Sequence, residues 1–381
     1  MTQPFQFSPI FADSEAPEST EPPRDPAHER VGIAIVGLGR ISVNEMLPAF
    51  AQCRHAKPVA LVTGERAKGL AIARQYDIPD SAVLGYEDVE TLATMPEVQA
   101  VYIGLPNSLH AEYTIRAAKA GKHVLCDKPM ANSVAECEGM IAACRQAGRK
   151  LMIAYRRQYD VLDRALVKMI RAGELGALKE MVAVNSQHMA DPDHWRLRHA
   201  LSGGGALPDI GIYCINAARF LSGEEPSEVT GTTWSTPGDA RFAEVDESCQ
   251  FILRFPSGFT ATCSTGYAAH KSQMMRLNGT RAWARMDPGF AYQGNALTLA
   301  RVVDGQEQES TFPLTEASQF AQMIDHFALC IREDRDVHTP GEEGLQDQRI
   351  IEAIYTSART RQTVQLSQPG RTRGPEPDEP A

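Results

Sequence analysis

An apolar run that meets two closely spaced glycines constrains the fold of this chain more than any other stretch. Residues 31–40 read V-G-I-A-I-V-G-L-G-R, and the run from Ile33 to Val36 does not alternate, which is typical of a strand buried on both faces of a parallel sheet. Gly37 permits a tight turn, and Gly39 lets the backbone approach a pyrophosphate at the N-terminus of the next helix. The stretch predicts the first strand and phosphate turn of a dinucleotide-binding unit, although an ordinary buried strand before a glycine turn has the same pattern.

Further buried strands alternate with helices after this turn. We expect strands at 58–62, 100–103, 123–126 and 150–154, and helices at 44–53, 67–76, 111–120 and 134–146. Ligands of open α/β sheets bind beyond the carboxyl ends of the strands, so the segments at Gly37, Thr63, Leu105 and Asp127 are predicted to face one crevice. Four strand ends at one crevice indicate a nucleotide site more strongly than any single motif.

The pattern changes from about residue 161. A helix at 161–172 precedes alternating runs at 179–188, 229–235, 246–255, 259–267 and 273–278, with late helices at 317–332 and 345–359. We therefore predict an α/β N-terminal Rossmann domain at 31–154. An α+β C-terminal domain at 155–366 would have an open, mostly antiparallel sheet, with one face free for substrate or for another subunit.

Both ends of the chain are rich in proline and charge. Residues 1–30 hold six prolines, no apolar run of signal-peptide length and no twin-arginine pair, so we expect a cytoplasmic protein. This N-terminal arm is either disordered or a strap that orders against the cofactor or a neighbouring subunit. Residues 367–381 are expected to form a disordered, solvated tail.

Charge and cysteine content exclude several classes of function. The net charge of -10 argues against nucleic acid or an anionic membrane as the main partner. The eight cysteines form no C-x-x-C pair, which favours reduced, mostly buried thiols over a zinc site or a disulfide framework. We expect no metal.

The end of the second strand bears on the choice between NAD and NADP. An acidic residue there would bond the ribose hydroxyls of NAD, whereas neutral and basic residues accommodate a 2′-phosphate. Thr63, Gly64, Arg66 and Lys68 stand at this place, which favours NADP. Exposed residues at a helix start, beside Glu65, would give the same pattern.

Two stretches carry the chemistry. Lys128 ends a strand inside the predicted crevice, where a cation is costly to desolvate, and Pro129 restricts it to extended geometry. Residues 203–213 read G-G-G-A-L-P-D-I-G-I-Y, a flexible glycine run before a helix that places Asp209 and Tyr213 on one face. A nearby ammonium favours a phenolate, which would make Tyr213 a general acid or base for a sugar hydroxyl or carbonyl. Taken singly, each stretch also suits a surface turn or a capped, packed helix.

Motifs from both halves occur in order, and they resemble the Gfo/Idh/MocA oxidoreductases, in particular the branch that acts on aldoses. The motifs are G-L-G-R, L-P-N-S-L-H, D-K-P-M-A, A-Y-R, W-R-L-R, G-G-G-x-L-x-D-I-G-I-Y and P-G-E-E-G-L-Q-D. The resemblance spans roughly residues 33–364, which include most of both predicted domains. The resemblance implies a Rossmann domain, an open and largely antiparallel sheet, and a nicotinamide cofactor held so tightly that it recycles on the enzyme.

The resemblance also implies roles for single residues. Lys128, Asp209 and Tyr213 would be catalytic, and together with Arg156 and Tyr292 they would contact the sugar. The matching cofactor positions are Gly37, Leu38, Gly39, Arg40, Ile41, Thr63, Gly64, Lys68, Tyr86, Leu105, Pro106, Asn107, His110, Asp127, Lys128, Arg156, Trp195 and Arg196.

Two residues depart from the family pattern. Asp127 replaces the usual Glu, so its contact to the cofactor or to the lysine would be lost or mediated by water. Ser42 stands where the third fingerprint position usually has a small apolar residue.

The sequence thus predicts an NADP-dependent oxidoreductase that oxidises a cyclic aldose at C1 to the aldonolactone and, with NADP retained, reduces a second sugar to an alditol. A sugar dehydrogenase or reductase with dissociable NADP(H) stays open. So does a non-catalytic dinucleotide-binding regulator, which would need none of Lys128, Asp209 and Tyr213. We expect a homodimer or homotetramer.

Overall fold

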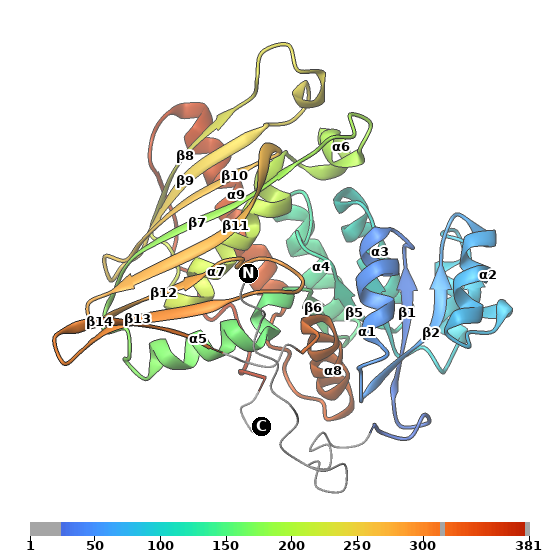
Figure 1. Cartoon of the computed structure of the whole chain (residues 1–381). Helices are drawn as coiled ribbons and strands as arrows, with labels where there is room; N and C mark the ends of the chain where they lie inside the picture. Colours follow the sequence, from blue (N-terminus) through green and yellow to red (C-terminus); the bar gives the residue numbers. More distant parts are fainter. Residues whose placement is uncertain (1–23, 313–316, 378–381) are drawn as a thin grey trace, which may run out of the picture.

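A six-stranded parallel sheet organises the first part of the chain (Figure 1), in a computed structural model that describes residues 24–312 and 317–377. The strand order is β3-β2-β1-β4-β5-β6, with parallel pairing throughout. The strands are β1 (Val31–Val36), β2 (Ala56–Val62), β3 (Val83–Leu84), β4 (Ala100–Ile103), β5 (His123–Cys126) and β6 (Leu151–Ile153). This is the doubly wound order of dinucleotide-binding sheets, so the predicted Rossmann domain is confirmed. The two-residue β3 was missed, because it is too short to carry a pattern.

Helices α2 (Arg66–Gln75), α3 (His110–Lys119) and α4 (Val134–Gln146) follow β2, β4 and β5. The helix predicted at 44–53 is instead a π-helix at Ser42–Met46 and a short α1 at Leu47–Ala49. Pro48 explains the difference, because it has no N–H to donate and a regular helix cannot continue through it.

The second sheet has nine strands in the order β14-β13-β12-β11-β7-β10-β9-β8-β15. The strands are β7 (Leu178–His188), β8 (Glu228–Trp234), β9 (Ser248–Arg254), β10 (Thr260–Gly266), β11 (Ala268–Gly279), β12 (Ala282–Met286), β13 (Leu297–Val303), β14 (Gln306–Thr311) and β15 (Val364–Gln365). Within this second sheet, as far as the structure describes it, β7 and β10 are the only neighbours that pair in parallel, which confirms an open, mostly antiparallel sheet. Strands β12 to β14 were not predicted.

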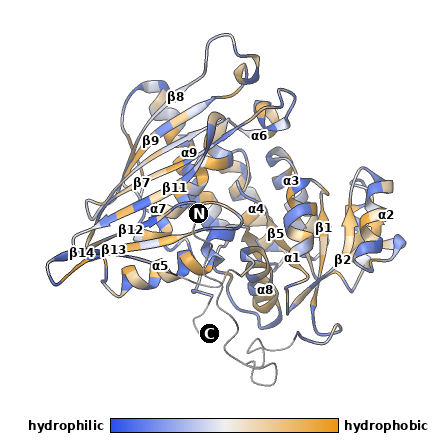
Figure 2. Cartoon of the chain, viewed as in Figure 1, coloured by the Kyte–Doolittle hydropathy of each residue, from blue (hydrophilic) through white to orange (hydrophobic). Residues whose placement is uncertain are grey.

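One face of this sheet is covered by helices. Figure 1 shows α5 (Val161–Arg171), α7 (Ile212–Ser222) and α9 (Gly341–Thr360) on one side of the sheet, and within residues 24–312 and 317–377 it draws no helix on the other. The strands alternate accordingly, and Figure 2 shows hydrophilic and hydrophobic residues in turn along them. On β9, Cys249, Phe251 and Leu253 are buried, and the residues between them are not.

The chain returns to the first sheet near its C-terminal end. Helix α8 (Gln319–Arg332) packs against β1 and β2, and the Asp325 carboxylate accepts hydrogen bonds from the Arg54 and His55 backbone N–H groups, both at 2.8 Å. Helix α8, although it lies within the predicted C-terminal domain at 155–366, thus covers part of the first sheet. Sequence periodicity marked this helix but could not say which sheet it covers.

The prediction of a disordered tail is wrong for residues 367–377. Buried Arg219 donates to the Thr372 hydroxyl at 3.2 Å, the Gly374 N–H donates to the His338 carbonyl at 2.9 Å, and Glu376 pairs with Arg171 at 2.6 Å. Arg171 lies on α5, Arg219 on α7 and His338 between α8 and α9, so the bonds that hold this segment come from parts of the chain that local sequence patterns do not connect to it. Residues 1–23 of the predicted arm, and residues 378–381, lie outside the described residues. Within residues 24–312 and 317–377, no helix combines the length and hydropathy that a membrane span requires.

Candidate active site

Lys128 follows β5 and is held by Asp209. Its Nζ donates to the Asp209 backbone oxygen at 2.6 Å and to Asp209 Oδ1 at 3.3 Å, and lies 4.7 Å from the centroid of the Tyr213 ring. Burial acts to lower the pKa of the Lys128 ammonium, but Tyr213, Asp209 and Asp127 outweigh it and raise that pKa. The lysine is therefore a charged donor, and its side chain is only 11% exposed.

Asp209 and Tyr213 lie on a helix that changes type between them. Residues Leu207–Gly211 form a π-helix, which continues into α7 with Tyr213 in its first turn. Pro208 stands at the start of the π-helix and again lacks an N–H for a regular ladder. Helix distortions of this kind are frequent at functional sites, and here the distorted turn presents both the carbonyl and the carboxylate of Asp209 to Lys128.

The glycine run before this helix is tightly packed, not flexible as predicted. A Cβ on Gly203 would lie 2.5 Å from the Asn132 side chain, one on Gly204 2.3 Å from the Tyr355 hydroxyl, and one on Gly205 1.9 Å from the Asp246 carbonyl. The glycines are required because three other segments approach the backbone here. This packing sets the position of the helix that carries Asp209 and Tyr213.

The second carboxylate oxygen of Asp209 is also occupied. Oδ2 accepts from the buried Tyr267 hydroxyl at 2.8 Å and pairs with Arg196 Nε at 3.0 Å. Burial alone would raise the pKa of Asp209, but Arg196 and Lys128 outweigh it and hold that pKa well below its usual value. Sequence reasoning missed Tyr267, because an isolated tyrosine between two strands carries no motif.

Arg196 reaches Asp209 from the loop between β7 and α6 (His199–Ser202). Its guanidinium lies 4.5 Å from the Trp195 ring centroid, so the two predicted positions are in contact. This segment brings Arg196 to the carboxylate of Asp209, and the cofactor-lining role that the resemblance implies for Trp195 and Arg196 stays a prediction.

Tyr213 is bonded by Arg156 rather than by Lys128. Arg156 Nε donates to the Tyr213 hydroxyl at 3.2 Å, and the guanidinium lies 4.8 Å from the Tyr213 ring centroid and 4.4 Å from that of Tyr292. The other bonds of Arg156 go to the Phe290 and Ala291 carbonyls and to the Gln319 side chain. Arg156 is 3% exposed, so its donors are used inside the protein and do not face the crevice, where a sugar or cofactor contact was expected. Tyr292 is 44% exposed, at the edge of the crevice.

The turn after β1 suits the approach of a phosphate. Gly37 has φ +94°, and a Cβ there would lie 2.6 Å from the Gly104 carbonyl, so the ends of β1 and β4 touch. A Cβ on Gly39 would meet only the Gly104 carbonyl at 3.9 Å, which leaves its face open. Leu38 and Leu105 are buried, Ile41 and Pro106 are half-buried, and Arg40 is exposed. The backbone here fits a dinucleotide at the carboxyl edge of the sheet.

Ser42 follows this turn, at the third fingerprint position. Its hydroxyl is fully buried and has no hydrogen-bond partner among the described residues. It lies close to Gly104, where an added Cβ would be 2.6 Å from Ser42 Oγ. The serine therefore fills the place of a small apolar residue against the end of β4.

The residues after β2 that were considered for the 2′-phosphate differ in their contacts. Arg66 Nη1 donates to the Val83 carbonyl at 2.8 Å, which ties that guanidinium to β3. Lys68 is exposed, Thr63 is buried, and Gly64 lies beneath the Tyr86 ring, at 3.4 Å for an added Cβ. Both cations considered for a 2′-phosphate are exposed, but the guanidinium of Arg66 is held by the Val83 carbonyl.

His110 and Asn107, two of the predicted cofactor positions, form hydrogen bonds that connect the segments around the crevice. Both ring nitrogens of buried His110 lie 2.9 Å from backbone oxygens, Nδ1 from that of Pro129 and Nε2 from that of Leu105. Asn107 Nδ2 donates to the Ser202 carbonyl at 2.8 Å. These side chains connect the ends of β4 and β5 and the segment before the glycine run.

The Asp127 carboxylate does not reach the lysine ammonium. Its Oδ1 accepts from the Lys128 backbone N–H at 2.8 Å, and its Oδ2 accepts from the Tyr102 hydroxyl at 3.3 Å. Asp127 therefore orients the backbone of Lys128, while Asp209 orients its side chain.

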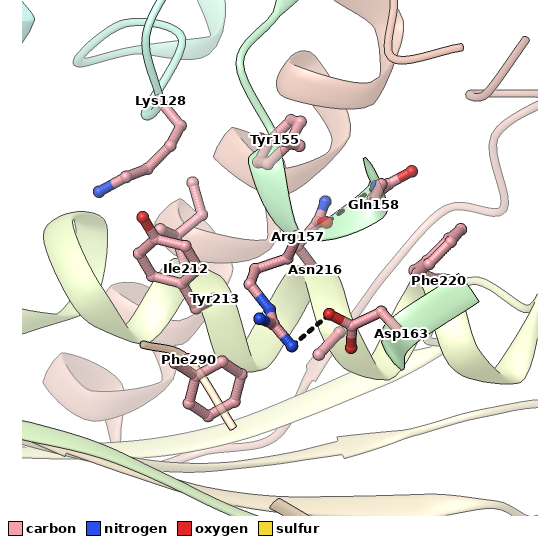
Figure 3. A pocket seen from close by; sticks show the side chains of 11 residues that line it. Lys128, Tyr155, Arg157, Gln158, Asp163, Ile212, Tyr213, Asn216, Phe220 and Phe290 are labelled. Carbon is pink, nitrogen blue, oxygen red and sulfur yellow. Dashed lines mark hydrogen bonds and ion pairs between the residues drawn. The ribbon is translucent and has the colours of Figure 1, made fainter. Parts of the chain in front are cut away.

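A narrow hollow lies behind Tyr213, between α7 and the segment that follows β6. Figure 3 shows Arg157 reaching between Tyr213 and Asp163, with which it forms an ion pair. Burial raises the pKa of Asp163 to about 7, although Arg157 acts in the opposite direction. Sequence reasoning missed this pair, for which the second arginine of A-Y-R-R was the available signal.

Comparison with known proteins agrees with this architecture. An oxidoreductase family with an NAD-binding Rossmann fold matches residues 31–155, and the GFO/IDH/MocA C-terminal domain matches residues 164–285. The D-xylose 1-dehydrogenase [NADP(+)] of Haloarcula marismortui is 32% identical over 342 residues, which cover 88% of this chain and 93% of the relative. A second D-xylose 1-dehydrogenase (NADP(+)), from Haloferax volcanii, is 30% identical over 87% of this chain and 98% of its own length.

Solved structures give the same picture. The aldose-aldose oxidoreductase of Caulobacter crescentus, complexed with glycerol, is 42% identical with a TM-score of 0.85, covering 88% of this chain and 100% of that chain. A similarity of this extent includes both sheets and the segments that form the crevice between them.

Proposed function

The chain belongs to the Gfo/Idh/MocA oxidoreductase family, and we propose that it oxidises a cyclic aldose at C1 to the aldonolactone with NADP as cofactor. One observation carries the proposal: Lys128, Asp209 and Tyr213 meet at the carboxyl edge of the Rossmann sheet. A protein that only binds a dinucleotide would need none of the three. The names of the relatives, which act on xylose or on aldoses, support a sugar as substrate.

In this reaction Tyr213 takes the proton from the C1 hydroxyl of the sugar. Lys128 donates a hydrogen bond to the same oxygen and steadies the charge that develops on it. Asp209 aims the lysine through two contacts and is itself held by Tyr267 and Arg196. The C1 hydrogen leaves as hydride while the C1–O bond becomes a carbonyl, so the lactone forms without loss or gain of other atoms.

The cofactor would lie along the carboxyl ends of β1, β2 and β4. Its pyrophosphate would rest on the open backbone of Gly39, and its 2′-phosphate would meet Thr63 and Lys68. When bound, NADP supplies the acceptor for the hydride that leaves C1. The relatives named as NADP enzymes support this choice of cofactor.

A second half-reaction completes the proposal. With NADP retained, a second sugar would enter the same crevice, receive hydride at its carbonyl carbon and take a proton from Tyr213, giving an alditol. The similarity to an aldose-aldose oxidoreductase favours this cycle. The similarity to two D-xylose 1-dehydrogenases favours the alternative, in which NADP(H) dissociates after each turnover.

An absorbance spectrum of extensively dialysed protein separates these alternatives. We expect nucleotide absorbance to stay with the protein, and the band of reduced nicotinamide to rise when glucose or xylose is added and to fall when a second sugar follows. Activity that needs added NADP would indicate the dissociable enzyme. A chain that binds NADP but oxidises no sugar of a broad aldose panel would contradict the proposed function and favour a regulator.

We also propose a homodimer or homotetramer that uses the uncovered face of the nine-stranded sheet. Trp234 is 61% exposed and Val182 is 41% exposed, on β8 and β7. Light scattering after size exclusion should give a mass two or four times that of the chain, and Trp234→Glu should lower it. A monomeric wild-type protein would contradict this proposal.

A further inference from the structure

Two cations approach the Tyr213 phenol, and they do so in different ways. Arg156 Nε donates directly to the hydroxyl at 3.2 Å. Lys128 lies over the ring, 4.7 Å from its centroid, and its hydrogen bonds go to Asp209. The arginine is therefore the cation that bonds the phenol oxygen, the atom that gains and loses the proton. The lysine ammonium contacts the face of the ring and bonds Asp209.

We propose that Arg156 is a positioning residue for proton transfer, which holds the Tyr213 hydroxyl and stabilises its phenolate, and that Lys128 is thereby left to bond the sugar oxygen. This inference rests on the proposed function, since it divides the labour within the same site. In oxidation the O–H bond of the sugar breaks and a new O–H bond forms on Tyr213. In reduction the reverse occurs, and the arginine keeps its contact to the oxygen in both states.

The surroundings of Arg156 suit this role. Its other hydrogen bonds run to the Phe290 carbonyl at 2.8 Å, to the Ala291 carbonyl at 3.1 Å and to the Gln319 side chain. Its guanidinium carbon lies 4.8 Å from the centroid of the Tyr213 ring and 4.4 Å from that of the Tyr292 ring. A guanidinium stays charged throughout the working pH range, and four fixed bonds leave it no freedom to turn away. Its 3% exposure strengthens the electrostatic effect, because little water screens it.

Other charged and titratable groups also face the phenol. Lys128 comes from the end of β5, Asp209 from the preceding π-helix and Tyr292 from the loop before β13. The Arg157–Asp163 pair adjoins the ring from the hollow behind it. The effect of Arg156 must therefore be measured as a change between matched variants in which all these groups are kept.

The test is the pH dependence of aldose oxidation in Arg156→Met, Arg156→Lys and Gln319→Leu. Removing an opposite charge in contact with an ionising group commonly shifts its titration by about 1 to 3 units. We expect Arg156→Met to move the rise of kcat to higher pH by about one unit or more, with a smaller change in KM. Arg156→Lys, which keeps the charge, should have a lower kcat but a midpoint close to that of wild type.

Gln319→Leu is the matched control. Gln319 bonds Arg156 and the carbonyls of Ala291 and Tyr292, but it does not contact Tyr213. If Arg156 acted only by holding this loop, Gln319→Leu would shift the midpoint as far as Arg156→Met does, and the proposal would be wrong. An unshifted midpoint in Arg156→Met would overturn it as well. Should the methionine variant not fold, a lysine variant whose midpoint shifts by a full unit or more would contradict charge stabilisation.

A second measurement does not depend on turnover. Ultraviolet absorbance detects phenolate, and the difference between wild type and Tyr213→Phe isolates the titration of this one phenol. The same difference measured on the Arg156→Met background should have its midpoint at higher pH. If no sugar is oxidised but this shift is found, the proposed function fails and the assignment of Arg156 stands. If sugar is oxidised but no shift is found, the proposed function stands and the assignment of Arg156 fails.

Discussion

Asp209 holds Lys128 at two points, through its backbone oxygen at 2.6 Å and through its carboxylate at 3.3 Å. Asp127 is the acid next to the lysine in sequence, and its contact to Lys128 is a hydrogen bond from the lysine backbone N–H, not from the ammonium. The direction of the ammonium is thus set by a helix 81 residues further along the chain. Both side chains are 11% exposed, so each needs the other as its counter-charge.

The Asp209→Asn variant should lose both stability and activity. Asparagine keeps the shape but leaves Lys128 and Arg196 without their carboxylate, and breaking a buried ion pair costs about 3–5 kcal/mol. Urea unfolding measures the loss. Asp239→Asn is the control, because Asp239 pairs with Arg241 near the surface and its loss should be much smaller. Equal losses of unfolding free energy in Asp209→Asn and Asp239→Asn would contradict the view that Asp209 is the buried counter-charge of Lys128 and Arg196.

Replacement of Tyr213 by phenylalanine should lower kcat by about 10² to 10⁴, because the proton acceptor is lost. NADP binding, measured by fluorescence titration, should stay within about twofold, a change of less than 1 kcal/mol. Tyr76→Phe, at the end of α2 and away from the crevice, should leave both quantities unchanged. Undiminished turnover in Tyr213→Phe would remove the tyrosine from the mechanism.

For cofactor choice, Lys68→Ala should weaken NADP binding about tenfold or more and leave NAD binding nearly unchanged, since a charged hydrogen bond contributes about 1.5–3 kcal/mol. Arg66→Ala should have a smaller effect on this ratio, because the Arg66 guanidinium is bonded to the Val83 carbonyl. Calorimetric titration with each dinucleotide measures both. Equal weakening of NAD and NADP by Lys68→Ala would refute the assigned phosphate contact.

A gain in stability is expected for Ser42→Ala. The Ser42 hydroxyl is buried without a hydrogen-bond partner among the described residues, and an unpaired buried polar group costs about 1–3 kcal/mol. Thermal unfolding of the cofactor-free variant should therefore occur at a higher temperature than for wild type. If instead the midpoint drops and NADP binding weakens, the hydroxyl bonds the cofactor.

The buried Asp163 carboxyl should make stability depend on pH. Its pKa is raised to about 7, above the ordinary value of 3.8, so the folded protein holds this proton more tightly than the unfolded chain does. The resulting contribution is fully present below the ordinary value and is lost as the pH rises through about 7.

Thermal unfolding at pH 5 and pH 8.5 in Asp163→Asn and wild type tests this effect. The amide cannot ionise, so the variant should gain on wild type as the pH rises. Glu138→Gln, an exposed carboxylate that pairs with Arg349, is the control and should show no such gain. A constant difference between Asp163→Asn and wild type at both pH values would contradict the buried titration.

Much of the fold could be predicted because its signals are local. The apolar β1, the alternation of the later strands and the glycine turn depend on residues that are close in sequence. Short or irregular elements escaped, such as the two-residue β3 and the π-helix around Ser42. In these elements a proline or a neighbouring strand decides the structure, and periodicity has too few residues to register it.

The sequence by itself placed Lys128 at the crevice, because strand ends in a parallel sheet meet at one edge, and it placed Asp209 beside Tyr213, because residues four apart on a helix lie close together. That the lysine and this pair share one site was implied only by the resemblance to the Gfo/Idh/MocA oxidoreductases. Only the tertiary structure decided which atoms meet. Arg156 bonds the Tyr213 hydroxyl, and Tyr267 bonds Asp209, although each pair is more than fifty residues apart. Such contacts arise from the packing of α7 against β7 and β10, where burial selects one set of hydrogen bonds from many that the sequence allows.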